Sequence, residues 1–211
     1  MPSLETLLVF TAAAMILNIS PGPSNFYVMA RSLGQGAGAG AVAAGGLAFG
    51  SLGHVAAAAL GISALFAYSP AAYTALKLLG AGYLIYLGIR TLRDGGGQAL
   101  PARGAAAKPV GRIFWESSLV ELLNPKTALF FLAFLPQFVD TAAGPVAPQM
   151  LLLGLIVTLT AIPCDLFVAM ASGAAGHLFD RHPWVTRLQA QISGSVLIGL
   201  GLFVALARRG D

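Results

Sequence analysis

The stretch Asn18-Ile19-Ser20-Pro21-Gly22-Pro23-Ser24-Asn25 lies inside an apolar run that is long enough to cross a membrane. Pro21 and Pro23 lack backbone N–H groups, and each clashes with the carbonyl four residues before it. The carbonyls of Leu17 and Ile19 therefore lose their partners within a helix. Because hydrocarbon cannot hydrate these groups, the break must be buried in protein or line a wet cavity. The stretch thus predicts a functional site within the membrane.

The composition is that of an integral membrane protein. Of 211 residues, 57% are hydrophobic and 9% are charged, the mean hydropathy is +0.79, and soluble domains carry roughly 25% charged residues. A spanning helix needs about 20 apolar residues, and six such segments can be drawn: Leu4–Ala30, Ala39–Phe66, Pro70–Ile89, Ile113–Phe138, Gln149–Ser172 and Ile192–Ala207. We expect an all-α protein with about six transmembrane helices in a single domain, residues 1–211.

Basic residues predict the orientation. They gather in the connection Arg90–Arg112, which is rich in Gly, Ala and Pro and is expected to be a basic cytoplasmic loop. If the spans alternate in direction, Arg31, Arg181 and Arg187 fall on the same side. Both termini are then periplasmic and the protein lies in the inner membrane, although Arg208 and Arg209 argue mildly against this orientation. The net charge of +4 reports orientation, and no nucleic-acid partner is expected.

The fourth apolar segment is interrupted like the first, at Leu122-Leu123-Asn124-Pro125-Lys126. Each half of the chain thus begins with a broken segment, in repeat one at about 4–90 and in repeat two at about 113–207. Three spans per half would leave the two repeats inverted in the membrane. Interrupted segments at matching positions of two halves are a strong sequence indication of a transporter's central site.

The two interruptions predict a site for a small zwitterion. Ser20-Pro21 and Asn124-Pro125 both have an N-cap residue followed by proline at the first helical position, so new half-helices are expected from Pro21 and Pro125. Their N-terminal ends each carry about half a positive charge, and Lys126 adds a full one, which suits a carboxylate. An ammonium group would bind the freed carbonyls of Leu17, Ile19 and Glu121. The predicted substrate-binding residues are Asn18, Ser20, Pro21, Gly22, Pro23, Asn124, Pro125 and Lys126.

A plainer interpretation stays open for the same two stretches. Proline also kinks membrane helices without forming any site, and Asn18 and Asn124 would then only bind neighbouring backbone groups. The matched placement of the two breaks and the adjacent Lys126 favour the site.

Three stretches carry a family resemblance: Asn18–Pro23 followed by Ala30-Arg31-Ser32, Leu76–Gly88, and Asn124–Phe131 with Pro136–Phe138. With them the chain resembles the LysE/RhtB family of amino-acid exporters over nearly its whole length. The resemblance implies a transporter and not an enzyme, which exports homoserine, homoserine lactone, threonine or another neutral amino acid by proton antiport. Ser24 departs from the family, which often has an acidic or amide residue there.

Ionisable residues inside apolar segments need partners or water, because each costs roughly 2.5 to 3.5 kcal/mol on insertion scales. Asp165, which follows Pro163, is the leading proton carrier. Glu121 either pairs with Lys126 across the break or binds substrate. His54 is a hydrogen-bonded interior residue or a proton-coupling group, and Lys77 is a partner for a buried acid.

Neither a metal site nor a cofactor is predicted, since Cys164 is alone and the histidines His54, His177 and His182 are scattered. Export of an inorganic cation by the same scaffold is the alternative function, because freed carbonyls also suit cations. In the second segment, Gly36-x-x-x-Gly40 and Gly46-x-x-x-Gly50 predict close helix packing. Such faces pack against neighbouring helices and against lipid, and they also allow a homodimer.

Overall fold

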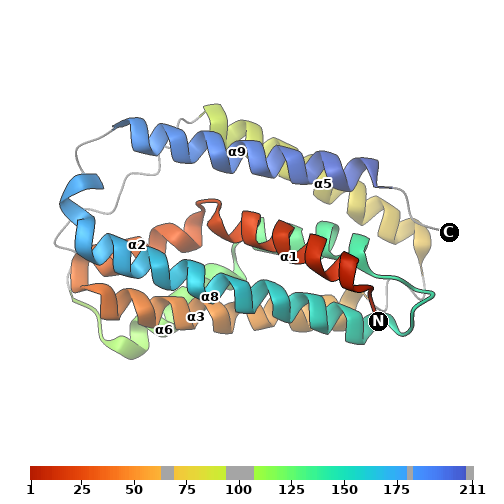
Figure 1. The fold of residues 1–211 in the computed structure, drawn as a ribbon, viewed down its shortest axis with the longest axis horizontal. Coiled ribbons are helices and arrows are strands. Elements are labelled where there is room, and N and C mark those ends of the chain that lie inside the picture. Colours follow the sequence, from red (N-terminus) through yellow and green to blue (C-terminus); the bar gives the residue numbers. More distant parts are fainter. Residues whose placement is uncertain (63–68, 94–106, 180–182, 208–211) are drawn as a thin grey trace.

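The computed structural model describes residues 1–62, 69–93, 107–179 and 183–207, and within them the chain forms helices and no strand (Figure 1). Arg103, Arg181, His182, Arg208 and Arg209, with most of the predicted basic loop, lie outside the described residues. The elements are α1 (Leu4–Ile19), α2 (Pro23–Gln35), α3 (Ala37–Ala57), η1 (Ala58–Ile62), α5 (Pro70–Arg93), α6 (Val110–Leu122), α7 (Pro125–Leu129), η2 (Phe130–Phe134), η3 (Leu135–Phe138), α8 (Val146–Phe179) and α9 (Pro183–Leu206).

Both predicted interruptions are breaks between helices. The axes of α1 and α2 meet at 51°, and those of α6 and the helical run Pro125–Phe138 meet at 44°. Each bent pair is long and apolar enough to be one span, as are three unbroken helices in the described residues, and Ala190–Leu206 is a shorter apolar helix. These segments follow the predicted order, so the chain is an all-α integral membrane protein.

Two helices extend beyond their predicted limits. The helix α8 begins at Val146 and runs without interruption to Phe179, and Pro163 inside it does not end it. Membrane helices tolerate proline where neighbouring helices satisfy the freed backbone groups. The helix α9 begins at Pro183, well before the predicted Ile192.

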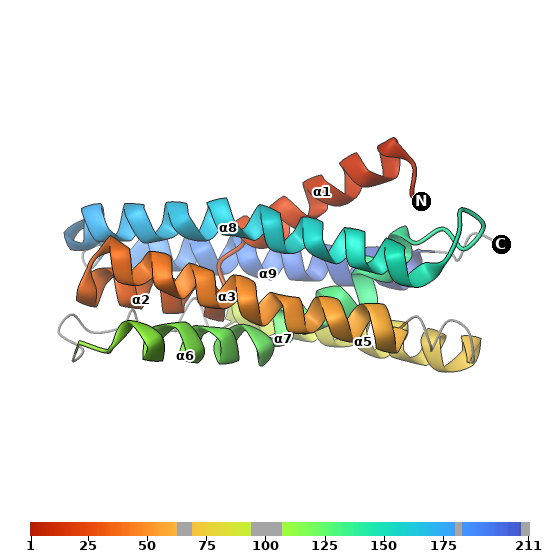
Figure 2. The same cartoon turned by 90° about the horizontal axis from the view of Figure 1, so that it is seen from below.

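The helices form two groups. In one, α3 packs against α2, α6 and α8, and in the other α5 pairs closely with α9 (Figures 1 and 2). A side chain at Gly46 or Gly50 would overlap backbone carbonyls of α6, which confirms close packing through this pair of glycines. Gly36 has no atom near its face and adopts a φ of 86° at the turn between α2 and α3. Its role is therefore in the turn and not in packing, contrary to the prediction.

Matching elements of the two halves lie side by side. The second spans, α3 and α8, pack together, and so do the third spans, α5 and α9. Two repeats related by a twofold axis would give this pairing, and their inversion stays a prediction. The N-terminal end of α1 and the C-terminal end of α9 lie at the same end of the molecule (Figure 1). Helix ends at the opposite end carry the described basic residues Arg31, Arg90, Arg93, Lys108 and Arg112.

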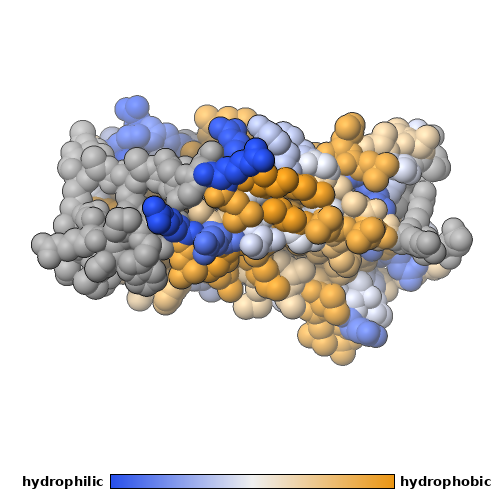
Figure 3. Space-filling view, turned by 90° about the horizontal axis from the view of Figure 1, so that it is seen from above, coloured by the Kyte–Doolittle hydropathy of each residue, from blue (hydrophilic) through white to orange (hydrophobic). Residues whose placement is uncertain are grey.

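Apolar side chains cover much of the outer surface, as expected where helices face lipid. Figure 3 shows hydrophobic side chains over most of the middle of one face, with hydrophilic ones in a few separate groups. On α5 Leu79 is 73% exposed, and on α8 Phe167 is 72% exposed. Inside, an aromatic cluster fixes the second half of the fourth span, and its members are Phe10, Phe130, Phe134, Phe138 and Phe203.

Candidate functional site

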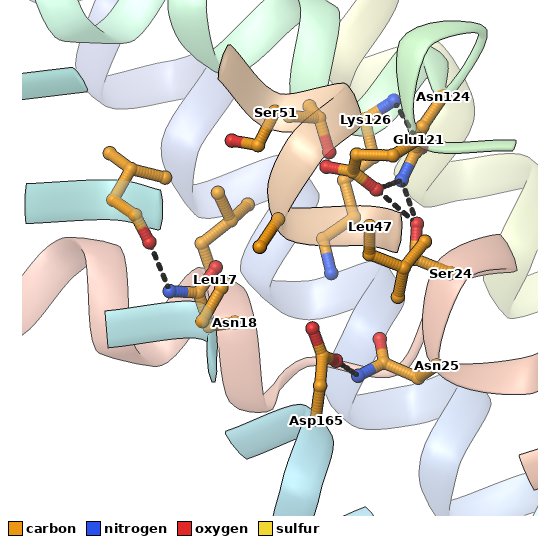
Figure 4. A pocket seen from close by; sticks show the side chains of 14 residues that line it. Leu17, Asn18, Ser24, Asn25, Leu47, Ser51, Glu121, Asn124, Lys126 and Asp165 are labelled. Carbon is orange, nitrogen blue, oxygen red and sulfur yellow. Dashed lines mark hydrogen bonds between the residues drawn. The ribbon is translucent and has the colours of Figure 1, made fainter. Parts of the chain in front are cut away.

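A cavity lies where the two breaks meet. It has an empty volume of about 500 Å³, including the part open to solvent. Figure 4 shows side chains from α1, α2, α3, α6, α7 and α8 converging on it. It is lined by Leu17, Asn18, Ser24, Asn25, Leu47, Ala48, Ser51, Glu121, Asn124, Lys126, Thr127, Val157, Ala161 and Asp165.

The break after α6 forms as predicted. Asn124 is the N-cap of α7, and its Oδ1 accepts a hydrogen bond of 3.0 Å from the backbone N–H of Lys126. Pro125 occupies the first helical position, where a missing N–H costs nothing. The Nδ2 of Asn124 donates to Ser24 Oγ at 2.8 Å and to Glu121 Oε2 at 3.3 Å. Asn124 therefore ends one helix, starts the next and joins both to α2.

The break after α1 differs from the prediction. Ser20 is the C-cap of α1, and its N–H bonds to Ile16, while α2 begins at Pro23 after the N-cap Gly22. The expected N-cap role of Ser20 and helix start at Pro21 are therefore wrong by two residues. A residue before proline avoids the helical region, so Ser20 and Gly22 are both extended. The helix can resume only at the second proline.

The Lys126 side chain crosses between the breaks. It is 8% exposed, and its Nζ donates a hydrogen bond to the carbonyl of Ser20. A Cβ at Gly22 would lie 3.3 Å from Lys126 Cδ, so glycine leaves room for the lysine stem. Among the described residues no salt bridge joins Lys126 to a carboxylate, so the predicted pairing with Glu121 does not form. The ammonium instead lies at the carbonyl end of α1.

Two buried carboxylates face the same cavity from different helices. Glu121 of α6 accepts hydrogen bonds from Ser24 Oγ and Asn124 Nδ2. Asp165 of α8 accepts one bond, from Asn25 Nδ2 at 3.4 Å. Ser24 and Asn25 are absent from the predicted binding set, although their place in the first turn of α2, directly after the prolines, was a usable signal. Both acids are held by neutral donors from the restart of a broken span.

The remaining predicted residues support the cavity or lie away from it. Asn18 lines the cavity and donates to Val157 O at 3.2 Å and Thr160 Oγ1 at 3.0 Å, which ties the end of α1 to α8. The carbonyl of Pro21 accepts a hydrogen bond of 2.8 Å from Ser193 Oγ. The residues that do not line the cavity are Ser20, Pro21, Gly22, Pro23, Pro125, His54 and Lys77.

His54 and Lys77 have structural partners. His54 Nε2 donates a hydrogen bond of 3.0 Å to the carbonyl of Glu121. The His54 ring stacks on the ring of Phe131, with 5.6 Å between the ring centroids. This arrangement agrees with the interior hydrogen-bonded reading of His54. Lys77 donates to the carbonyl of Ala207 at the end of α9, so the expectation that it partners a buried acid is wrong.

One wall of the cavity is apolar and was not predicted. It is formed by Leu17, Leu47, Ala48, Val157 and Ala161. Leu47 and Ala48 belong to the glycine-rich α3, whose close approach to α6 brings them beside the breaks. The glycine pattern was a signal for this approach, but it does not reveal which side chains line a cavity. A ligand here would meet both polar and aliphatic groups (Figure 4).

Comparisons with known proteins identify the family of this chain. A family model described as LysE type translocator matches residues 15–208. A leucine efflux protein of Salmonella typhimurium is 31% identical over 95% of this chain and 92% of its own length. The uncharacterized membrane protein YrhP of Bacillus subtilis is 31% identical over 97% of this chain and 100% of its own length. No solved structure matches. The chain therefore belongs to the LysE type translocator family.

Proposed function

We propose that the protein exports a small neutral amino acid or a close derivative across the cytoplasmic membrane by proton antiport. The observation that carries this proposal is the cavity between the breaks, which combines helix N-terminal ends, a helix carbonyl end and an aliphatic wall. Such half-helix ends bind charged substrate groups in other secondary transporters. The family and its relatives are transporters, and this supports export over catalysis.

The cavity suits an amino-acid zwitterion. Its carboxylate would lie near the N-terminal ends of α2 and of the run Pro125–Phe138, each with about half a positive charge. Its ammonium would lie near Ser20 and Asp165. An aliphatic side chain would then pack on the wall that includes Leu47. Homoserine and threonine are zwitterions of this kind, and the name of the Salmonella relative adds leucine. Homoserine lactone has the amino group but no free carboxylate, so it would use only the ammonium end of the site.

Proton coupling requires an ionisable group whose protonation changes when substrate binds. Asp165 and Glu121 line the cavity, and His54 contacts the backbone of Glu121. Buried ionisable groups in transmembrane segments commonly form proton relays. Asp165, with one hydrogen bond from Asn25, is the carboxylate with fewer donors.

The alternative, export of an inorganic cation, has less support. The carbonyl end of α1 would attract a cation, but the Lys126 ammonium already occupies Ser20 there. A metal ion would also need a group of acidic, histidine or cysteine ligands, and the described residues contain no such group. A metal-tolerance assay in cells that lack their own exporters separates the two functions, since an amino-acid exporter gives no protection against metal salts.

The orientation follows from the basic end of the molecule. With Arg31, Arg90, Arg93, Lys108 and Arg112 in the cytoplasm, both termini are periplasmic. Substrate then enters the cavity from the basic end and leaves toward the termini.

An efflux panel tests the function. Cells that lack their own exporters are loaded with leucine, threonine, homoserine or homoserine lactone, and release is followed with and without an uncoupler. We expect faster release of at least one compound, and loss of the acceleration when the proton gradient collapses. No acceleration for any compound would refute the exporter, and acceleration that survives the uncoupler would refute proton antiport alone.

A further inference from the structure

We propose that Lys126 carries the exchanged proton, because its ammonium and the ammonium of the substrate compete for the carbonyl of Ser20. This inference rests on the proposed amino-acid export and assigns the coupling group within that same site. Lys126 would be protonated when the cavity is empty and neutral when an amino acid is bound.

The geometry places Lys126 where a substrate ammonium belongs. Ser20 caps the C-terminal end of α1, which carries about half a negative charge and favours a cation. The Lys126 ammonium already donates to the Ser20 carbonyl. The hydroxyl of Ser20 is also fully buried and has no hydrogen-bond partner in the described residues. Ser20 does not itself line the cavity, so a substrate ammonium reaches these two oxygen acceptors by taking the place of the Lys126 ammonium.

The charges around Lys126 do not hold it in a fixed ion pair. The negative charges of Glu121 on α6 and Asp165 on α8 attract the Lys126 ammonium. Glu121 is already bound by Ser24 and Asn124, and Asp165 is bound by Asn25. Among the described residues neither acid forms a salt bridge with Lys126. From α3, His54 contacts the Glu121 carbonyl. From α2, the facing groups are the neutral Ser24 and Asn25. A second ammonium in this cavity would thus destabilise the first, since like charges oppose each other.

The resulting cycle balances protons and charge. When a zwitterion binds from the basic end, its ammonium forms the hydrogen bond to Ser20, the N–H bond of Lys126 breaks, and the proton goes to water on that side. After the amino acid leaves toward the termini, Lys126 takes a proton from that side and returns to Ser20. Each amino acid that moves out is thereby matched by one proton that moves in.

Asp165 does not compete with the substrate ammonium for an acceptor. It lies on α8, its hydrogen bond comes from Asn25, and it shares no acceptor with a substrate that binds the end of α1. Lys126 and the substrate do share one, and repulsion between two ammonium groups at the same carbonyl disfavours binding of both. By linkage, a ligand that displaces a proton must itself be displaced by protons.

A calorimetric titration of the purified full-length protein tests the inference. L-leucine, L-threonine and L-homoserine are each titrated in buffers of different ionisation enthalpy, which gives the protons released per amino acid bound. We expect one proton per amino acid, and an affinity that weakens about tenfold for each pH unit of acidification. Binding without proton release would overturn the inference and leave Lys126 as a charged carboxylate ligand. If none of the three binds, the exporter proposal itself fails.

Variants then identify the group that releases the proton. In Lys126→Arg the guanidinium keeps its positive charge because arginine does not release its proton. We therefore expect no proton release on amino-acid binding, and amino-acid binding that is at least about tenfold weaker. The Asp165→Asn variant should still release a proton for each amino acid bound. Loss of release in Asp165→Asn, or release retained in Lys126→Arg, would overturn the assignment. Lys77 is a lysine outside the cavity. Lys77→Gln is therefore the matched control and should release protons as the wild type does.

Discussion

The amide of Asn124 donates a hydrogen bond to the hydroxyl of Ser24, 2.8 Å away, although 100 residues of sequence separate them. The bond joins the restart of the fourth span to the restart of the first. Ser24 passes the connection on to the Glu121 carboxylate, so one buried chain of donors links α7, α2 and α6. The two broken spans therefore form one connected unit.

We expect Asn124→Ala to lower export at least about tenfold while the protein still inserts. The change removes the cap of α7, worth about 1 kcal/mol. It also removes the donor to buried Ser24 Oγ and one of the two donors to Glu121, and the loss of a buried hydrogen-bond partner costs about 1–3 kcal/mol. Asn124→Asp keeps the cap and loses the donor, so it should fall between wild type and Asn124→Ala. Efflux normalised to membrane-inserted protein is the measurement.

Gly61→Ala is the control for the Asn124 variants. A Cβ at Gly61 meets no atom within 4 Å, so export should be unchanged. Equal export by Asn124→Ala and Gly61→Ala would show that the link to Ser24 has no role in transport.

Leu47→Ala should alter selectivity. Leu47 is 2% exposed and lines the apolar wall of the cavity. Truncating the Leu47 side chain removes its van der Waals contacts with an aliphatic substrate. Contacts of this kind contribute about 1–3 kcal/mol to the discrimination between two substrates. The ratio of leucine to threonine efflux should fall about tenfold. This ratio is independent of expression level, and an unchanged value would place the substrate side chain elsewhere.

A network around Glu116 joins helices at the basic end. Its carboxylate accepts hydrogen bonds from Tyr27 Oη at 2.9 Å, Lys108 Nζ at 2.5 Å and Arg112 Nε at 2.8 Å. This network joins α2 to the start of α6. Because the ion pairs are partly exposed, each is worth less than about 1 kcal/mol, and Glu116→Gln should increase opening at this end about two- to fivefold.

Labelling measures this opening. In a Cys164→Ser background, Ala161→Cys places a thiol in the cavity wall. A membrane-impermeant maleimide applied from the basic end should react about two- to fivefold faster in Glu116→Gln. Glu5→Gln, an exposed acid at the opposite end, is the matched control. If both variants label at the wild-type rate, the network does not restrict access.

Gly50→Val should destabilise the fold. A Cβ at Gly50 overlaps the backbone carbonyl of Ser118, which cannot move aside without shifting α6. Overpacking of this kind costs about 1–3 kcal/mol, so the melting temperature in detergent should fall. Gly45→Ala on the same helix meets no atom within 4 Å and should melt at the wild-type temperature or slightly above it. Equal melting of the two variants would contradict the packing argument.

The orientation predicts the behaviour of fusion proteins. A C-terminal reporter that works only in the cytoplasm should be silent, because the start of α1 and the end of α9 lie at the end opposite Arg31, Arg90, Arg93, Lys108 and Arg112 (Figure 1). A reporter that works only in the periplasm should be active at the same junction. The reversed pattern would invert the assignment and the direction of the transport path.

Sequence reasoning succeeded where a residue acts on its own backbone. Proline and a capping residue determine a break locally, so the start of α7 at Pro125 is confirmed. It failed at Ser20 because two prolines compete, and the restriction on the residue before each proline delays the helix to Pro23.

The cavity wall could be predicted only in part, because its members meet through tertiary packing. Sequence periodicity does not show that Asn25 faces Asp165 across 140 residues or that Lys77 faces the end of α9. The family pattern placed Lys77 in a motif, but its partner depends on how α5 pairs with α9. Contacts of this kind appear only once the helices are assembled.

The position of the break along the first span has an electrical consequence. Sixteen residues of α1 precede it and 13 residues of α2 follow it, which at 1.5 Å per residue is about 24 Å and about 20 Å. A charge that reaches Lys126 from either face therefore crosses close to half of the transmembrane voltage, or about 1 kcal/mol per 100 mV. The step in which a charge enters the site from one face and the step in which a charge leaves through the other should therefore depend almost equally on the membrane voltage.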